Sequence, residues 1–236
     1  MLKMGYFTDD LTVKAYKFAY SQNYDHSYPN ENIIRLSSAL KIKKNSKCLD
    51  YGYGFGENLI HFAKKDLDMY GIDIDNDLKR KVFKKISDRN INLKHTPKLH
   101  TLKSSDKKLP YKNNFFDFIL CNQTLYLLAD EVKIQKLLKD IYRITKKNGT
   151  LLFTMMSEKN WCCTDGEYLG NNVYSFDDKS KLNKIKGNFL HKYYIVNSIP
   201  HIKYLFKDFN VEEVGFFDNS YYGVNGHHYV VVCKKK

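Results

Sequence analysis

The sequence of 236 residues lacks any apolar run of the roughly 18 residues that a membrane-spanning helix needs. Lys3, Asp9 and Asp10 stand among its first residues, which is not the pattern of a signal peptide. It also lacks a Cys-x-x-Cys pair and a His/Cys ligand cluster, although it contains five cysteines: Cys48, Cys121, Cys162, Cys163 and Cys233. These absences predict a reduced cytoplasmic protein with no membrane contact, structural disulfide or metal.

The net charge of +13 is concentrated in one stretch of the chain. Between Lys79 and Lys108, eleven Lys and Arg stand against two acidic residues, whereas from Ser157 to Lys236 eleven Lys stand against nine. A solvated helix face explains a local excess at least as well as nucleic acid does. Nucleic-acid binding is therefore the less favoured interpretation.

Apolar periodicity predicts strands alternating with helices through the middle of the chain. Phe115–Cys121 is almost wholly apolar, as a central strand buried on both faces should be. Glu131–Lys147 has one apolar face and reaches Asn148-Gly149, a typical helix C-cap. The expected strands are Lys47–Tyr51, Asp68–Ile74, Leu99–Lys103, Phe115–Cys121 and Thr150–Met156; the expected helices are Glu31–Leu40, Asn58–Lys65, Leu78–Asn90 and Glu131–Lys147.

This alternation predicts an α/β fold with a doubly wound, mostly parallel seven-stranded sheet and flanking helices. Phe209–Phe217 and His227–Lys234 are expected to add an antiparallel C-terminal hairpin at the sheet edge. Residues 157–200 are polar, aromatic and irregular. We expect a single domain, 1–236, with a cofactor-binding core at about 41–156 and an acceptor cap formed by 1–40 and about 157–205.

Three glycines, Gly52, Gly54 and Gly56, follow a predicted strand and open a predicted helix. Glycine permits a positive φ and close approach of a ligand to the backbone. A dinucleotide-binding loop would have its third glycine where this chain has Glu57, whose carboxylate would repel a pyrophosphate. The Gly-Lys-Ser/Thr of a phosphate-binding P-loop is also absent. The loop instead suits a ligand with an ammonium and a sulfonium, and Asp50 is placed to accept from the ammonium.

Asp73 ends the second predicted strand, about twenty residues beyond the first glycine. A carboxylate at this position binds a ribose diol in adenosyl cofactors. Three motifs then occur in order: Cys48–Asn58 around the glycines, Tyr70–Asp75, and Leu109–Asn122, which contains Leu-Pro-Tyr and Phe-Phe-Asp. They resemble the motifs of class I S-adenosylmethionine-dependent methyltransferases over roughly residues 30–156. Tyr28–Arg35 is similar to the segment before the first motif in small bacterial members.

The resemblance implies a set of contacts with S-adenosylmethionine. Asp50 and the glycines would line the methionine part, Asp73 would hold the ribose, and residues before Leu109 would face the adenine. The family usually has an acidic residue where this chain has Ser105, and Asp106 is one position later, so either is a candidate. The expected cofactor-binding residues are Asp50, Gly52, Gly54, Gly56, Asp73, Ile74, Ser105, Asp106, Asn122 and Gln123.

The acceptor is less well defined by the sequence. A hydroxyl acceptor needs a base, and histidine suits that role near neutral pH. The candidate bases are His227, His228 and His201; the first two should point to opposite faces of the last strand. The chain lacks the Asn/Asp-Pro-Pro-Tyr type of motif that resembles what amino- and base-methylating members use.

We therefore expect a methyltransferase acting on a hydroxyl of a small molecule such as a sugar or glycan precursor. An RNA or protein methyltransferase and a non-catalytic module that binds S-adenosylmethionine are the alternatives.

Overall fold

A computed structural model describes residues 27–103, 106–177, 190–221 and 224–236. Its main feature is a seven-stranded sheet with the order β3-β2-β1-β4-β5-β12-β9. The strands β1 to β5 run parallel, while β12 is antiparallel to both neighbours. The bounds are β1 Lys47–Tyr51, β2 Asp68–Asp73, β3 Lys98–Thr101, β4 Phe116–Cys121, β5 Thr145–Met156, β9 Phe209–Phe217 and β12 His228–Lys235. This sheet confirms the predicted fold class, including the antiparallel β9–β12 pair at one edge.

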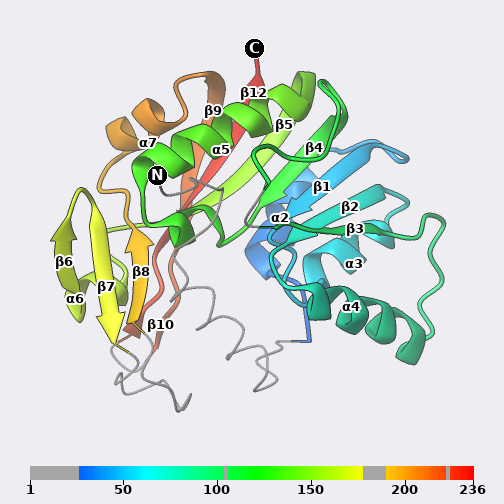
Figure 1. The fold of residues 1–236 in the computed structure, drawn as a ribbon, viewed down its shortest axis with the longest axis horizontal. Helices are drawn as coiled ribbons and strands as arrows, with labels where there is room; N and C mark the ends of the chain where they lie inside the picture. Colours follow the sequence, from blue (N-terminus) through cyan, green and yellow to red (C-terminus); the bar gives the residue numbers. More distant parts are fainter. Residues whose placement is uncertain (1–26, 104–105, 178–189, 222–223) are drawn as a thin grey trace.

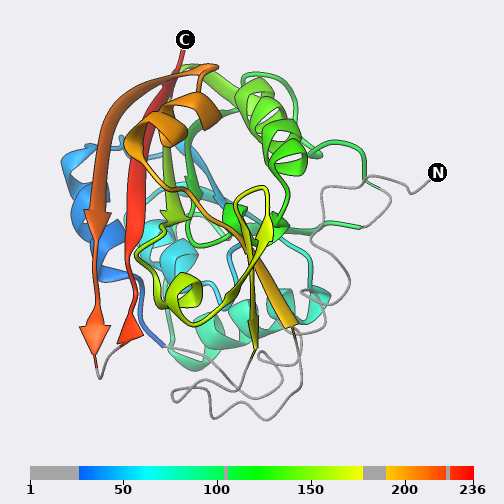
Figure 2. The same ribbon diagram turned by 90° about the vertical axis from the view of Figure 1, so that its left-hand side faces the viewer.

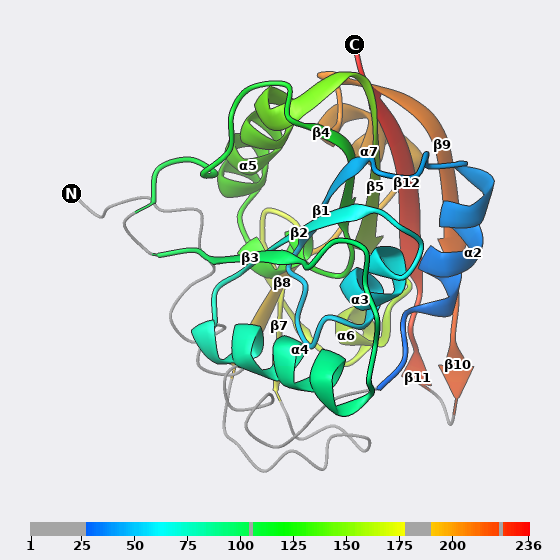
Figure 3. The ribbon, with the colours of Figure 1, turned by 90° about the vertical axis from the view of Figure 1, so that its right-hand side faces the viewer.

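Helices cover both faces of the sheet, as Figures 1 and 3 show. One face packs on α2 Glu31–Ala39, α3 Glu57–Ala63 and α4 Asn76–Asp88 through residues such as Ile33, Leu59 and Val82. The other packs on α5 Glu131–Ile144, α7 Ile199–Leu205 and the 3-10 helix η1 Leu125–Leu128. Each face therefore has its own apolar cluster, with the sheet between them.

The end of α5 differs from the expectation. The helix ends at Ile144, and Thr145 already belongs to β5, so the predicted extension to Lys147 and the Asn148-Gly149 cap are wrong. Thr145 is fully buried and its Oγ1 donates to Ile141 O at 2.7 Å, which closes the last turn of the helix. Residues 146–149 are taken up by an irregularity in the β4–β5 pairing.

The segment after Ser157 also differs, because the expected irregular region contains a second sheet. Its three antiparallel strands are β6 Glu167–Gly170, β7 Val173–Asp177 and β8 Leu190–Tyr194, preceded by the short helix α6 Trp161–Thr164. A pair of two-residue strands, β10 Ser220–Tyr221 and β11 Val224–Asn225, extends the β9–β12 hairpin. The small sheet lies to one side of the large one in Figure 1 and faces the viewer in Figure 2.

β8 links the two sheets. Tyr194 of β8 is fully buried, and its hydroxyl lies 2.7 Å from Glu131 Oε2 on α5 and 2.9 Å from His201 Nε2 on α7. Tyr193 packs edge-on against Tyr126 of η1. The second sheet is thus fixed beside the end of β4. Within the described ranges, no helix is long and apolar enough to cross a membrane.

Candidate functional site

The glycine loop connects β1 to α3 at the carboxyl edge of the sheet. Gly52, Gly54 and Gly56 have φ of 77°, 52° and 80°, values that residues other than glycine rarely adopt. A Cβ on Gly52 would lie 2.3 Å from Oγ1 of Thr124, which follows β4. The loop therefore packs directly against the segment after β4, and only glycine fits there.

The third glycine faces a different neighbour. Gly56 is the N-cap of α3, and a Cβ there would lie 2.6 Å from Val82 Cγ2 on α4. Its backbone geometry thus serves the packing of α3 on α4.

Glu57 binds two cations of α4. Its carboxylate contacts Lys85 Nζ, and Arg89 lies at 3.2 Å. Because this charge is compensated, repulsion by Glu57 gives little reason to exclude a pyrophosphate, contrary to the argument from the sequence. The buried carboxylate of Asp50 gives a better reason to exclude a pyrophosphate.

Two carboxylates lie beneath the loop. Asp50 is 2% exposed, and its Oδ2 has no hydrogen-bond partner among the described residues. Burial and the nearby Asp73 raise the pKa of Asp50 to about 7. Asp73 accepts from the backbone N–H of Gly54 at 2.9 Å and of Ile74 at 2.7 Å. Burial raises the pKa of Asp73 to about 6, although the backbone hydrogen bonds oppose this rise.

Tyr53 lies beside these two carboxylates, and it was not among the expected site residues. Its side chain is buried, and its hydroxyl contacts no donor or acceptor in the described part of the chain. Burial raises the pKa of Tyr53, and the charges of Asp73, Asp75 and Asp50 raise it further. Uncompensated acceptors beside a glycine loop fit a ligand that carries an ammonium and a diol. S-adenosylmethionine meets this requirement, whereas a pyrophosphate would meet the carboxylates of Asp50 and Asp73.

Asn122 and Gln123 follow β4 at the same edge, next to the glycine loop. Both contact the hydroxyl of Thr154 on the neighbouring strand β5. Thr124 donates from Oγ1 to Asn122 O at 2.9 Å and to Tyr51 O at 3.3 Å, which ties this segment to β1. Neither threonine was predicted from the sequence.

The two adenine candidates have different outcomes. Ser105 lies outside the described residues. Asp106 accepts from the backbone N–H of Lys103 at 2.8 Å, and its own N–H donates to Lys103 O at 3.0 Å. Both residues therefore stay predicted adenine contacts.

The three candidate histidines occupy separate environments. His227 and His228 lie on opposite faces, as predicted, since His227 stacks on Phe216 and His228 on Phe217 of β9. His227 Nδ1 lies 2.7 Å from Ser157 Oγ. His201 binds Tyr194 and Asn197, so its ring belongs to the contact between α7 and the second sheet.

His228 has a buried ring nitrogen that lacks a partner among the described residues. Its Nδ1 lies 2.9 Å from Gly226 O, which can only accept, so Nδ1 carries the proton. Nε2 is buried and receives no hydrogen bond from the described residues. Burial lowers the pKa of His228, and His227 lowers it further. His228 pairs with Met156 at the end of β5, and its ring lies 5.8 Å from that of Tyr126. The lowered pKa favours the neutral form of this imidazole, which lies at the carboxyl edge of the sheet.

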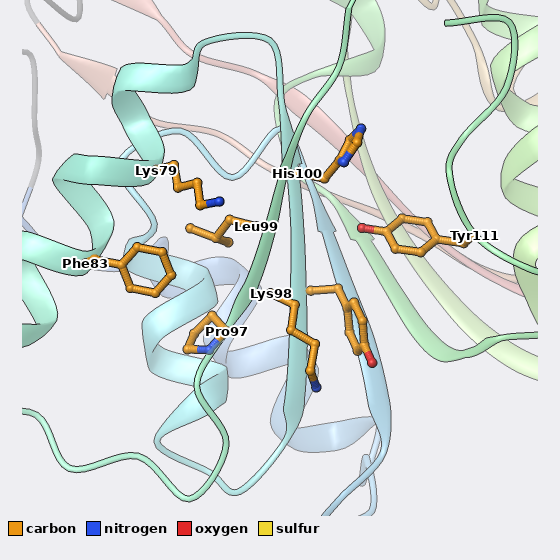
Figure 4. Close-up of a pocket in the computed structure, with 8 residues that line it drawn as sticks. Lys79, Phe83, Pro97, Lys98, Leu99, His100 and Tyr111 are labelled. Atoms are coloured by element: carbon orange, nitrogen blue, oxygen red, sulfur yellow. The ribbon is translucent and has the colours of Figure 1, made fainter.

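A hollow of about 340 Å³ lies away from this site, across the edge strand β3. Figure 4 shows Lys79 and Phe83 of α4 on one side of the strand, and His100 and Tyr111 on the other. In the described part of the chain, no group of three His, Cys, Asp or Glu side chains is arranged to hold a metal ion.

Comparison with known proteins identifies the family. A family model described as "Methyltransferase domain" matches residues 22–208. A methyltransferase of Methanosarcina mazei dependent on S-adenosylmethionine superimposes with a TM-score of 0.69 at 16% identity, covering 88% of this chain and 98% of that one. The chain belongs to the class I S-adenosylmethionine-dependent methyltransferase family.

Two further comparisons add detail. A Burkholderia thailandensis N1-methyltransferase, solved with S-adenosylhomocysteine and 1,6-didemethyltoxoflavin, has a TM-score of 0.66 at 13% identity, covering 96% of this methyltransferase and 88% of that chain. A phosphoethanolamine N-methyltransferase of Plasmodium falciparum is 29% identical over 178 residues, which are 74% of this chain. The match spans 64% of the length of that relative.

Proposed function

We propose that this methyltransferase acts on a small-molecule acceptor whose attacking atom loses a proton, with a hydroxyl of a sugar or glycan precursor as the favoured acceptor. The buried, unprotonated Nε2 of His228 carries the proposal. A neutral imidazole with one free lone pair is suited to take that proton near pH 7.

The cofactor site is proposed from the residues of the glycine loop. Asp50 would accept from the ammonium and Asp73 from the ribose hydroxyls, with Ile74 and Asp106 near the adenine. A carboxylate has about four acceptor positions, so Asp73 can bind both backbone N–H groups and still accept from a diol. When bound, the cofactor supplies an electrophilic methyl group on a sulfonium.

The contribution of the protein to such a transfer is alignment. Holding both reactants in line is worth roughly 7–11 kcal/mol in favourable cases. Asn122 and Gln123, at the end of β4, are proposed to orient the reacting groups. The second sheet, within residues 157–205, is proposed to cover the acceptor as a cap together with residues 1–40, of which 1–26 lie outside the described residues.

The acceptor can be identified by screening. The methyltransferase is incubated with labelled S-adenosylmethionine and sets of nucleotide-activated sugars, free sugars, small amines and RNA. The amines include phosphoethanolamine because one relative bears that name. Transfer to a sugar hydroxyl supports the favoured acceptor. Transfer only to amines would make an amine, instead of a hydroxyl, the acceptor. Transfer only to RNA would refute the small-molecule proposal.

The base can be tested by replacing the three histidines separately with glutamine. We expect His228→Gln to lower kcat by about 10²–10⁴-fold on the acceptor found by the screen, because proton removal is lost. His201→Gln and His227→Gln are matched controls, because they make the same substitution at the other two candidate histidines, whose rings bind Tyr194 and Ser157. Equal losses in all three variants, or none in His228→Gln, would show that His228 is not the base.

RNA is a second candidate acceptor because of the basic stretch, but many of those charges are paired within the protein. Arg80 binds Asp77, Lys84 binds Asp88, and Lys98 binds Asp68. Lys85 and Arg89 share Glu57. RNA affinity that fell steeply with added salt would support this candidate.

A module that binds the cofactor without turnover is the remaining alternative. It predicts cofactor binding by calorimetry without formation of S-adenosylhomocysteine in the presence of any screened acceptor.

A further inference from the structure

Thr154 is a polar residue in the interior of β5. It is fully buried, between Phe153, which pairs with Cys121 at the end of β4, and Met155. On its other side β5 pairs with β12, and Thr154 lies opposite Val230. A threonine in such a position must find hydrogen bonds within the protein.

Both of its hydrogen bonds go to the two residues that follow β4. Thr154 Oγ1 accepts from the backbone N–H of Gln123 at 2.6 Å and donates to Asn122 Oδ1 at 3.1 Å. Gln123 has a φ of 54°, in the left-handed region that a non-glycine residue occupies at a cost. One hydroxyl therefore holds a strained backbone and the neighbouring amide side chain together.

We infer that Thr154 is a positioning residue for methyl transfer: its hydroxyl sets the orientation of Asn122 and Gln123 at the place where the methyl group leaves the sulfonium. The inference rests on the proposed function, which places Asn122 and Gln123 there. Thr154 itself is enclosed and acts through these two residues.

A purely structural role is the competing explanation, and β5 offers a matched control. Thr145, at the opposite end of the strand, is also fully buried, and its hydroxyl also donates a hydrogen bond, to Ile141 O. Thr145→Val removes the same hydroxyl far from the carboxyl edge. It should lower the midpoint of thermal unfolding without changing ligand preference.

The experiment compares two ligands by calorimetry and needs no acceptor. Sinefungin carries an ammonium in place of the methyl sulfonium, whereas S-adenosylhomocysteine has no group there. We expect Thr154→Val to weaken the binding of sinefungin about tenfold more than that of S-adenosylhomocysteine. The reason is that Asn122 and Gln123, proposed to face the ammonium that replaces the sulfonium, lose their fixed orientation. Thr154→Ser, which keeps the hydroxyl, should retain the wild-type ratio of dissociation constants, as should Thr145→Val.

A double-mutant cycle with Asn122→Leu tests the route of the effect. If Thr154 acts through its neighbours, Thr154→Val changes the ratio much less in the Asn122→Leu background than in the wild type. An equal change in both backgrounds, or an unchanged ratio in Thr154→Val, would overturn the inference while the proposed cofactor site stands. If Asn122→Leu alone leaves the ratio unchanged, the proposed placement of Asn122 fails, and the inference fails with it.

Discussion

Asp50 and Asp73 are the residues whose charge depends most directly on the ligand. Burial raises the pKa of Asp50 to about 7 and that of Asp73 to about 6, so near neutral pH the free protein holds part of a proton on Asp50. An ammonium placed against Asp50 favours the ionised form and lowers its pKa. Ligand binding at this site should therefore release a proton.

The first prediction at this scale is a pH dependence of affinity. Between pH 6 and 7 the affinity for S-adenosylhomocysteine should rise with pH, by at most about tenfold per unit, because below the pKa of Asp50 a proton must be removed. Calorimetry in buffers of different ionisation enthalpy measures the affinity and the released proton. Asp50→Asn should bind more weakly and lose this slope; the same slope in the variant would assign it to another group.

The stability of the unliganded protein should change with pH in the opposite direction to the ligand affinity. A carboxyl whose pKa is higher in the folded than in the unfolded state destabilises the fold as the pH rises from the unfolded value towards the folded one. Asp50 and Asp73 should thus lower the free energy of unfolding progressively between about pH 4 and 7. Bound ligand should reduce that loss.

At the scale of elements, the contact between α3 and α4 depends on Gly56. A methyl group there would meet Val82 at 2.6 Å and would also require a φ of 80°. We expect Gly56→Ala to lower the free energy of unfolding by about 1–3 kcal/mol, measured by denaturant unfolding. The affinity of the folded protein for S-adenosylhomocysteine should stay close to that of the wild type.

The double variant with Val82→Ala provides the check. Removing the methyl groups that clash should relieve part of the cost, so the two substitutions together should destabilise less than the sum of their separate effects. Simple additivity, or a loss of ligand affinity as large as that of Asp73→Ala, would show that Gly56 acts on the ligand instead.

The elements also show which features the sequence predicts well. The central strands were predictable because a strand buried on both faces is apolar at almost every position, as in β4, where Asp117 is the exception. The glycine run marks the loop after β1. The end of α5 was not predictable, because Asn148-Gly149 has the composition of a helix cap while the hydroxyl of Thr145 closes the helix earlier. The second sheet was missed because β8 pairs with β7 across a long connection, and no local periodicity records that pairing.

The site divides along the same line. Asp50, the glycines and Asp73 follow one another at spacings that chain connectivity fixes, so the sequence was sufficient to group them. In the sequence, Thr154 looks like any other residue of a strand. Its importance depends on its hydrogen bond to Asn122, which follows a different strand, β4. His227 and His228 were equivalent in the sequence. Their Nδ1 partners distinguish them in the structure, Ser157 Oγ for His227 and the carbonyl of Gly226 for His228.

For the whole molecule, ligand binding should appear as added stability. A ligand that binds only the folded state at a hundred times its Kd adds about 2.7 kcal/mol. For a chain of this size that corresponds to about 5–11 °C in Tm. S-adenosylhomocysteine should produce such a shift in a thermal unfolding assay. NAD, which shares the adenosine but carries a pyrophosphate, should produce none, and Asp73→Ala should reduce the shift with S-adenosylhomocysteine. An equal shift with NAD would contradict the assignment of the loop.

The position of β12 between β5 and β9 has a consequence for how the molecule opens. β12 is hydrogen-bonded along both sides, whereas β9 is bonded along one, so β9 can detach alone but β12 cannot be released without breaking two ladders. Its pairing with β5 also closes a loop that contains the entire second sheet. The entropic cost of closing this loop is offset only by contacts made when the whole region has folded. Amide exchange should therefore be slow on β12 and fast on β9, so His228 stands on a strand that stays paired when β9 detaches.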